Sequence, residues 1–499
     1  MTRRARILIV VTLSLSGVVS VSGAGEIPDR PEKLVFKPLE YTPPAVGDAR
    51  FQLTNGIPVF AVEDRQLPLI TLTMLIRGGR LLEPTGKEGV AALTGAAWRK
   101  GGAGDLDARA FDEKLDFLAA ELSTTFEDLT GTVRLNVLSK DFDQALALLV
   151  DLVQRPRFQE DRFALEKTDQ IQLLKKRNDD SFEIQRREIN RLWWGDEYWR
   201  NRLPTQASIE AITAADCRAF LALQLGADNV TLALAGDFNR QEMEQKLNGA
   251  FGSLARLASP VLRPPRPEHA PVPGVYMVDK PDFNQGGVVI GHPSVEEGHP
   301  DELALRVLQE IYGMGGTSRL YLRIRAAEGL AYSAYSRFTL PLGGMPGAFV
   351  ISFQSKSSTC IRATQIAREE LKRIREELVS DEELKRAKAS LIETLPDSFE
   401  SPEVTAKLFA QGELLGRPAE YWSSYAEKVR AVTAEEVLKA AAAHMKPETL
   451  VFLYVGNTAD IRGGHPDHAG AIEDFGPITM VPLRDPLTLA EPAATSAAH

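Results

Sequence analysis

Histidine is scarce in this sequence, and its placement limits the chemistry that the first half can perform. The 499 residues include seven histidines, and none of them precedes His269. Cysteine is scarcer still, since two residues are too few for a disulfide scaffold, and we expect Cys217 and Cys360 to be separate, unpaired thiols. The net charge of −10 argues against nucleic acid as a partner. Whatever the first half does, it does without imidazole.

Long hydrophobic runs are also missing, except at the start of the chain. Three arginines precede an apolar run of about fifteen residues, and the run ends in the small residues of Ser22-Gly23-Ala24. This run is shorter than the roughly 20 residues that span a bilayer, so it is typical of a cleavable secretory signal peptide. We therefore expect residues 1–24 to be removed, the protein to be exported to the periplasm, and no stable membrane insertion.

The chain is longer than one hydrophobic core usually holds, so it predicts two or more domains. Hydrophobic residues make up 44% and charged residues 25%, as in ordinary folded proteins. Six prolines fall between Ser259 and Gly274, and proline at this density favours an extended linker. The predicted organisation is an N-terminal domain at 25–258, a linker at 259–273, a C-terminal domain at 274–458 and a tail at 459–499, which we expect to be poorly ordered after about Asn457.

The two halves repeat one another at a constant offset. Thr213 opens an apolar-periodic helix with an acid three residues on, and Thr433 does the same 220 residues later. The apolar strands that follow these helices end at Gly236 and Gly456, again 220 residues apart. Two matches at one offset indicate an internal duplication.

Strand and helix signals alternate within each half, which predicts an α+β or α/β architecture with sheets packed under helices. Residues 69–77 are apolar and β-branched, and residues 131–137 alternate like a strand with one wet face. Ser380, with a glutamate three residues on, is expected to open a long helix. A further helix is expected to bury one stripe formed by Phe142, Leu146, Leu149 and Val153.

The segment from Gly89 to Gly102 resembles the active-site helix of the pitrilysin-type zinc peptidases. It begins GVAALTGA and ends KGG, whereas that superfamily, which includes insulin-degrading enzyme and the mitochondrial processing peptidase, has roughly G-x-A-H-x-x-E-H followed by K-G-T. Residues 132–158 and 298–336 resemble other parts of the same proteins, and the likeness covers most of residues 50–457. The resemblance implies an α+β fold of two duplicated halves, each a mixed, mainly antiparallel sheet flanked by helices.

The residues that this resemblance assigns to zinc are missing. The two histidine ligands fall at Ala92 and Ala96, the general-base glutamate falls at Gly95, and the third ligand falls near Gln172 or Leu173. Zinc needs lone-pair donors, and catalysis needs a base that takes a proton from the bound water. We therefore expect no metal or other cofactor in this chain, and no peptidase activity from the chain alone.

The second half keeps two other residues of the family pattern. Arg325 and Tyr332 stand in RAAEGLAY with the spacing R-x6-Y. In active members this pair is implied to hold the scissile carbonyl and to stabilise the oxyanion of the tetrahedral intermediate. The alternative is that Arg325 is a solvated helix charge and that Tyr332 only packs a strand. The surrounding signature favours the functional role.

A chain without the metal but with this pair suggests a division of labour. The leading hypothesis is the non-zinc-binding subunit of a heterodimeric zinc peptidase, whose homologous partner carries H-x-x-E-H and its zinc, and whose substrate is a peptide or unfolded polypeptide. The alternative is a non-enzymatic peptide-binding or scaffold protein of the same fold. A self-sufficient hydrolase is disfavoured, because the sequence has no G-x-S-x-G elbow.

Three further groups of side chains are given structural roles. The first group is His292, Glu296, Glu297 and His299, which superficially resemble metal ligands. A proline follows each of the two histidines and breaks the helix that such a metal site would need, so this segment is expected to be a loop. The tail histidines, His465 and His468, are expected to be solvated. The three tryptophans, Trp193, Trp194 and Trp199, are expected to be buried under a loop or at a subunit contact.

Overall fold

The computed structural model describes Arg30, residues 40–261 and residues 263–492. The predicted signal peptide at 1–24 lies outside these residues. The chain from Thr42 onward clusters as one unit, separate from the residues before it, and the fold below is that of this unit. In the part that is described, no helix is long and apolar enough to cross a membrane.

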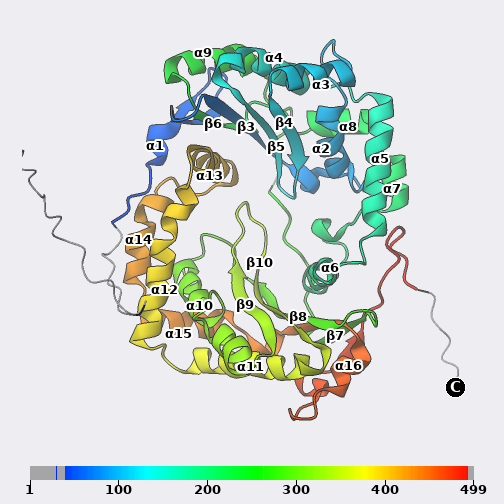
Figure 1. The fold of residues 1–499 in the computed structure, drawn as a ribbon, viewed down its shortest axis with the longest axis vertical. Helices are drawn as coiled ribbons and strands as arrows, with labels where there is room; N and C mark the ends of the chain where they lie inside the picture. Colours follow the sequence, from blue (N-terminus) through cyan, green and yellow to red (C-terminus); the bar gives the residue numbers. More distant parts are fainter. Residues whose placement is uncertain (1–29, 31–39, 262, 493–499) are drawn as a thin grey trace, which may run out of the picture. The chain divides into compact units, whose positions relative to one another are not determined.

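The first half is built on a six-stranded mixed sheet (Figure 1). Its order is β1-β2-β6-β3-β5-β4, in which only β2 and β6 run parallel. The predicted strand at 69–77 is confirmed as β3, and the predicted alternation at 131–137 is confirmed within β5. The strands are β1 (Arg50–Gln52), β2 (Pro58–Glu63), β3 (Leu69–Arg77), β4 (Glu121–Phe126), β5 (Thr130–Leu138) and β6 (Val230–Gly236).

The second half repeats this plan. Its order is β12-β7-β11-β8-β10-β9, so that β7 to β11 occupy the places that β2 to β6 occupy in the first sheet. The parallel pair of β7 and β11 stands where the first sheet has β2 and β6. The α+β class with two matching halves is therefore confirmed. The strands are β7 (Gly274–Asp279), β8 (Gln285–Ser294), β9 (Ala331–Thr339), β10 (Gly347–Lys356), β11 (Val451–Gly456) and β12 (Ile478–Met480).

The helices begin where the local capping signals predict. Thr213, Thr433 and Ser380 each close a reciprocal capping box with the acid three residues on. The predicted apolar stripe from Phe142 to Val153 is buried. The first-half helices are α1 (Val46–Ala49), α2 (Val90–Lys100), α3 (Ala108–Phe117), α4 (Phe142–Gln154), α5 (Glu160–Lys175), α6 (Ser181–Trp194), α7 (Gln206–Ala211), α8 (Ala214–Ala222) and α9 (Arg240–Phe251). The second-half helices are α10 (Glu302–Tyr312), α11 (Cys360–Glu376), α12 (Asp381–Glu393), α13 (Pro402–Leu415), α14 (Tyr421–Ala431), α15 (Ala434–His444) and α16 (Thr458–Gly463).

One helix from each half packs on the sheet of the other half. Helix α13 of the second half packs on β2, β3 and β6 of the first sheet (Figure 1), where Phe409 is buried against Phe60. Helix α6 of the first half packs on β8 and β11 of the second sheet. The predicted burial of the tryptophans is confirmed, but their place is the core rather than a loop or a subunit contact. Trp193 and Trp194 of α6 and the nearby Trp199 share one apolar cluster with that sheet. The exchange ties the halves together through their cores.

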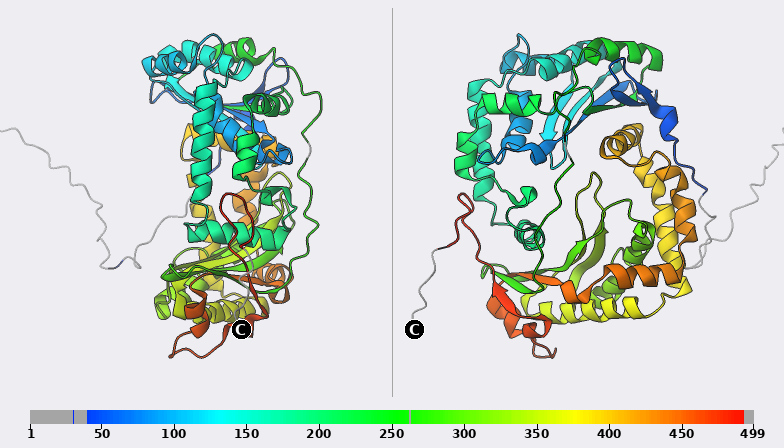
Figure 2. Two further views of the ribbon diagram at one scale, coloured as in Figure 1. Left: turned by 90° about the vertical axis from the view of Figure 1, so that its right-hand side faces the viewer. Right: turned by 180° about the vertical axis from the view of Figure 1, so that it is seen from behind.

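The segment between the halves carries no regular structure. Residues 259–273, among those described, form neither helix nor strand and connect α9 to β7 (Figure 2). His269 of this segment lies against the end of α6, with its Nε2 atom 3.2 Å from the carbonyl oxygen of Leu192. The linker thus contacts the helix that the first half contributes to the second sheet.

The prediction of a poorly ordered tail after Asn457 is wrong for the residues described up to 492. Strand β12 adds to the second sheet in parallel with β7, and α16 follows β11 directly. Ile472 and Phe475 bury their side chains, and the Phe475 ring stacks on Phe452 of β11. The proline and glycine content of this region suggested disorder, but a few well-spaced apolar residues are enough to hold the segment on the sheet.

The two cysteines are buried and free, which confirms the expectation of separate thiols. Burial raises the pKa of Cys217 to about 11 and that of Cys360 to about 12, so neither forms a thiolate near neutral pH. We therefore expect Ellman's reagent to label neither cysteine in the native protein and both in concentrated urea. Native labelling at the rate of a free thiol would contradict this packing.

Candidate functional site

Helix α2 holds the positions that the resemblance assigns to the zinc site. Ala92 is exposed and Ala96 is half-buried, one helical turn apart on the same face, while Gly95 is buried. Two methyl groups and a hydrogen atom have no lone pairs, so this helix offers neither zinc ligands nor a general base. The site that the family uses for zinc does not fit zinc in this chain.

Helix α5 packs beside α2. It contains Gln172 and Leu173, the positions to which the resemblance assigns the third zinc ligand. The two helices are joined by an ion pair of 2.6 Å between the Lys100 Nζ and Glu166 Oε1 atoms. Farther along α5, Gln172 and Leu173 are both exposed, and an amide and an aliphatic chain take the place of a carboxylate. The scaffold of the site is kept although its ligands are not.

Gly95 marks an unusually close approach between α2 and the sheet. A Cβ atom at this position would lie 3.0 Å from the backbone nitrogen of Phe126 and 3.1 Å from the Cα atom of Thr125. The hydroxyl of Thr124 donates a hydrogen bond of 2.6 Å to the Gly95 carbonyl oxygen. Because all these atoms belong to β4, the glutamate of an active enzyme has no room here unless helix and strand move apart.

A buried acid that the sequence reasoning missed caps α2. The Glu83 carboxylate accepts hydrogen bonds of 3.0 Å from the backbone N–H groups of Gly89 and Ala91. Burial raises the pKa of this carboxyl group, and its hydrogen bonds to the helix oppose that shift. Glu83 thereby satisfies donors at the start of α2 that no other side chain reaches. It lies six residues before Gly89, too far for the usual capping spacing to reveal it.

Tyr332 occupies an irregularity of β9. Ala334 pairs with Phe353 of β10, but the next pair joins Ala331 to Ser355, so two residues of β9 stand opposite one residue of β10. Such a bulge re-aims side chains, and bulges are over-represented beside active sites. Tyr332 lies in it and is 83% exposed. A tyrosine that only packed against a strand would be buried, so this exposure favours the functional role.

Arg325 comes from a second irregularity, a π-helical segment over Tyr321–Ala327. Its guanidinium carbon lies 4.6 Å from the centre of the Tyr332 ring and 4.9 Å from the centre of the Tyr321 ring. The structure therefore brings the two predicted residues together and adds Tyr321, which the sequence reasoning missed. The four-residue spacing from Tyr321 to Arg325 is the signal that could have found it.

The other arginines of this region are held by carboxylates, but Arg325 is not. Arg319 makes a bidentate pair with Glu383 of α12 at 2.8 and 3.0 Å, and Arg323 contacts the buried Glu370 of α11 at 2.7 Å. Among the described residues, Arg325 has only its two ring contacts. These ring contacts take up no oxygen acceptor, so the guanidinium N–H donors remain available to a ligand. Together with the Tyr332 hydroxyl, these donors suit a carbonyl oxygen or a carboxylate.

The histidines and glutamates of residues 292–299 do not form a common site, and His292 lies in β8 rather than in the expected loop. The buried His292 accepts a hydrogen bond of 3.0 Å at Nε2 from the Lys446 backbone, while its Nδ1 atom lies 2.8 Å from the Pro293 carbonyl oxygen. Burial lowers the pKa of His292. Glu297 instead makes a bidentate pair with Arg417, at 2.7 and 2.9 Å. The ring of His299 lies beside that of His444, with their centres 4.9 Å apart.

A cavity of about 420 Å³ lies between α6 and the second sheet. Its wall includes Trp193, Tyr335 and Arg337, the last two from the edge strand β9. Gln185 also lines it, 2% exposed and with neither amide atom hydrogen-bonded within the described part of the chain. A buried amide without a partner is costly, so the cavity offers a polar group to a ligand.

Comparison with known proteins finds similarity to one family of sequences. Residues 211–391 match the model described as "Peptidase M16 inactive domain". A Helicobacter pylori protein named "Non-peptidase homolog YmxG" is 25% identical over 406 residues, which cover 80% of this chain and 92% of that protein. A Rickettsia bellii protein named "Uncharacterized zinc protease" is 22% identical, over 78% of this chain and 90% of its own length.

Solved structures agree with the fold. A peptidase M16 inactive domain from Pseudomonas fluorescens superposes with a TM-score of 0.72 and 22% identity, covering 82% of this chain and 97% of its own. The periplasmic protease PqqL from Escherichia coli gives a TM-score of 0.69 and 16% identity, covering 81% of this chain and 45% of its own. The names of the similar proteins include both proteases and a non-peptidase. These names therefore do not decide whether this chain has peptidase chemistry, which depends on its own side chains.

Proposed function

Because this chain belongs to the M16 peptidase family, as an inactive member that lacks the residues of the zinc site, we propose that it is the metal-free subunit of a heterodimeric zinc peptidase. The zinc-bearing homologue would supply the H-x-x-E-H helix, and this chain would supply Arg325 and Tyr332. The observation that carries the proposal is the Arg325 guanidinium, which lies over two tyrosine rings and has no hydrogen-bond acceptor among the described residues. An arginine on the surface that served only as a solvated charge would be expected to have no ring contacts and to move freely in solvent.

The two side chains would act on the substrate carbonyl oxygen. As the carbonyl carbon becomes tetrahedral, negative charge collects on this oxygen, and the guanidinium N–H groups and the phenol O–H donate to it. The ring stack holds Arg325 in place before the substrate arrives, so little reorganisation is needed when the charge develops. The ion pairs of Arg319 and Arg323 anchor the π-helical segment to α11 and α12 and thereby fix the origin of the Arg325 side chain.

Export belongs to the same proposal. The basic and apolar start of the chain would direct it to the periplasm, where the partner and a peptide or unfolded polypeptide would meet it. Amino-terminal sequencing of the protein from periplasmic extract is expected to begin after Ala24.

The test is complementation between purified subunits. Peptidase activity on an unstructured polypeptide is expected when this chain is mixed with a zinc-bearing homologue encoded in the same genome, and neither protein alone should show it. A zinc chelator should abolish the activity of the mixture, and a pull-down should recover the pair. A homologue that is fully active alone, and unaffected by this chain, would contradict the proposal.

The second candidate is a peptide-binding or scaffold protein without proteolysis. The cavity beside the edge strand β9, with its unpartnered Gln185 amide, favours it. An extended peptide could add to such an edge through main-chain hydrogen bonds. This candidate predicts peptide binding by the chain alone, with an affinity indifferent to Arg325→Ala.

A further inference from the structure

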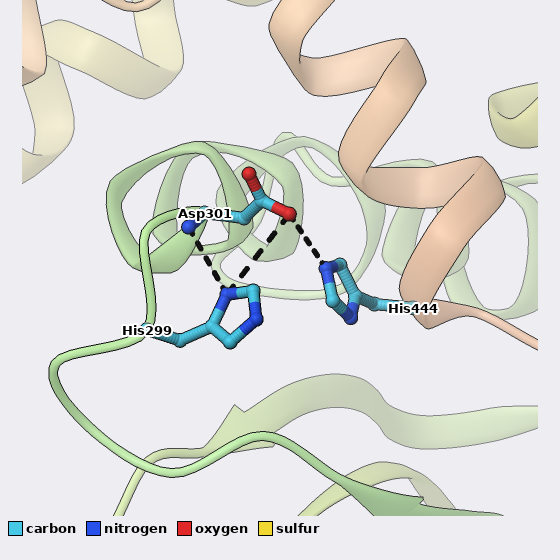
Figure 3. Close-up of side chains that lie close together, drawn as sticks. All are labelled: His299, Asp301 and His444. Carbon is cyan, nitrogen blue, oxygen red and sulfur yellow. Dashed lines mark hydrogen bonds and ion pairs between the residues drawn. The ribbon is translucent and has the colours of Figure 1, made fainter.

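Three potential metal ligands meet at the junction of α10 and α15 (Figure 3). His299 and Asp301 stand just before α10, and His444 is the last residue of α15. One ligand atom from each residue lies within 4.8 Å of the other two, and within the described part of the chain this is the sole such group. We propose that His299, Asp301 and His444 bind a divalent first-row metal ion of the zinc class.

The donor set favours this class of ion. Two imidazoles with one carboxylate suit zinc and its neighbours, whereas calcium and magnesium prefer oxygen ligands alone. Three protein ligands also leave a coordination position for water. None of the three residues belongs to the zinc motif at α2, so the inference is independent of the proposed function.

The distances require only small side-chain movements. The His444 Nε2 atom lies 2.7 Å from the Asp301 Oδ2 atom, and the His299 Nδ1 atom lies 4.0 Å from the same oxygen. Around a tetrahedral zinc ion, ligand atoms stand roughly 3.4 Å apart. The first separation must therefore open and the second must close, each by less than about 1 Å. The separation between the two histidine nitrogens is within 4.8 Å, so it must close by at most about 1.4 Å. Small rotations of the side chains bring the ligand atoms to these separations, and each histidine then exchanges its present hydrogen bond with Asp301 for the metal ion.

His299 already carries an unprotonated nitrogen, whose lone pair a metal ion would take over from a backbone N–H group. Its Nδ1 atom accepts a hydrogen bond of 3.1 Å from the Asp301 backbone N–H, which requires that this nitrogen carry no proton. His299 also lines a cavity of about 390 Å³, which gives an ion a route from solvent. His444 is the most enclosed of the three, with 13% of its side chain exposed.

The competing interpretation is an ion pair between helix ends. An acid at the start of α10 and a protonated histidine at the end of α15 both complement the helix dipoles, and their contact needs no metal. That ion pair does not use His299, because the 4.0 Å separation is too long for a hydrogen bond. A metal ion would engage all three residues. His299 therefore distinguishes the two interpretations.

The experiment uses the full chain without an affinity tag. Cobalt(II) and zinc(II) are titrated into chelator-treated protein, cobalt being followed by its visible absorption and zinc by competition with a chromophoric chelator. One equivalent is expected to bind, and His299→Gln and Asp301→Asn should each weaken binding at least tenfold. The matched control is His465→Gln/His468→Gln, which removes the only other close pair of histidine rings in the described residues, 5.1 Å apart, and should leave the affinity unchanged.

Several outcomes would overturn the site. These are the absence of stoichiometric binding, binding that His299→Gln does not weaken, and binding that disappears in the His465→Gln/His468→Gln control. His444→Gln also breaks the ion pair and can lower stability without metal, so the decision rests on His299→Gln. Circular dichroism of each variant in chelator shows whether it is folded. The complementation assay can fail while the metal titration succeeds, so the two proposals are separable.

Discussion

Replacing Arg325 with alanine is expected to lower the kcat/KM of the complemented peptidase by about 10²–10³-fold, the usual effect of losing one donor to an oxyanion. The loss should appear mainly in kcat, because the interaction strengthens as charge develops on the substrate oxygen. Arg325→Lys should recover only part of the rate, since an ammonium group does not reproduce the planar donors or the stacking on Tyr321 and Tyr332.

Two further variants separate positioning from charge stabilisation. Tyr332→Phe keeps the ring beneath Arg325 and removes only the hydroxyl, so it should cost about as much as the loss of one donor. Tyr321→Phe keeps both rings and no proposed donor is lost, so the rate should stay near that of the wild type. Arg386→Ala is the matched control, because within the described residues this exposed arginine pairs with Glu382 on its own helix and with no other acid. Unchanged kcat in both Arg325→Ala and Tyr332→Phe would refute the proposed role.

The parts of this structure that the sequence predicted are those encoded by neighbouring residues. The capping boxes at Thr213 and Thr433 each need only an acid three residues on, and their constant offset revealed the duplication. The strand at 69–77 follows from a run of apolar and β-branched side chains. Arg325 and Tyr332 were singled out because their R-x6-Y spacing stands in a segment that resembles the family signature.

The parts that escaped prediction depend on contacts between distant residues. The apolar faces of α6 and α13 predict burial, but nothing local says that each helix covers the sheet of the other half. His444 meets Asp301 across 143 residues, so no spacing rule could join them. Strand β12 is three residues long and is recognised only because β7 offers it an edge. A bulge and a π-helical turn, which aim Tyr332 and Arg325, leave no pattern in composition.

Restoring the zinc motif is expected to damage the protein rather than to create a peptidase. In an ordinary helix Gly→Ala stabilises by about 1 kcal/mol. Here Gly95→Ala should instead lower the free energy of unfolding, by about 1 kcal/mol, because the added Cβ atom meets the β4 backbone 3.0 Å away and overpacking costs about 1–3 kcal/mol. Urea unfolding followed by circular dichroism measures the difference.

The triple change Ala92→His/Gly95→Glu/Ala96→His tests whether the three restored motif residues give peptidase activity. Its matched control is Ala92→His/Ala96→His, in which both histidines point from the more exposed side of α2 and the stability should fall by about 1 kcal/mol from helix propensity alone. Adding the glutamate should cost about 2 kcal/mol more, because its side chain must push α2 away from β4. Neither variant should hydrolyse peptides, since Gln172 and Leu173 still supply no carboxylate. A triple variant as stable as its control would show that α2 can accept the lost base, and that the chain lost its chemistry without closing the space for it.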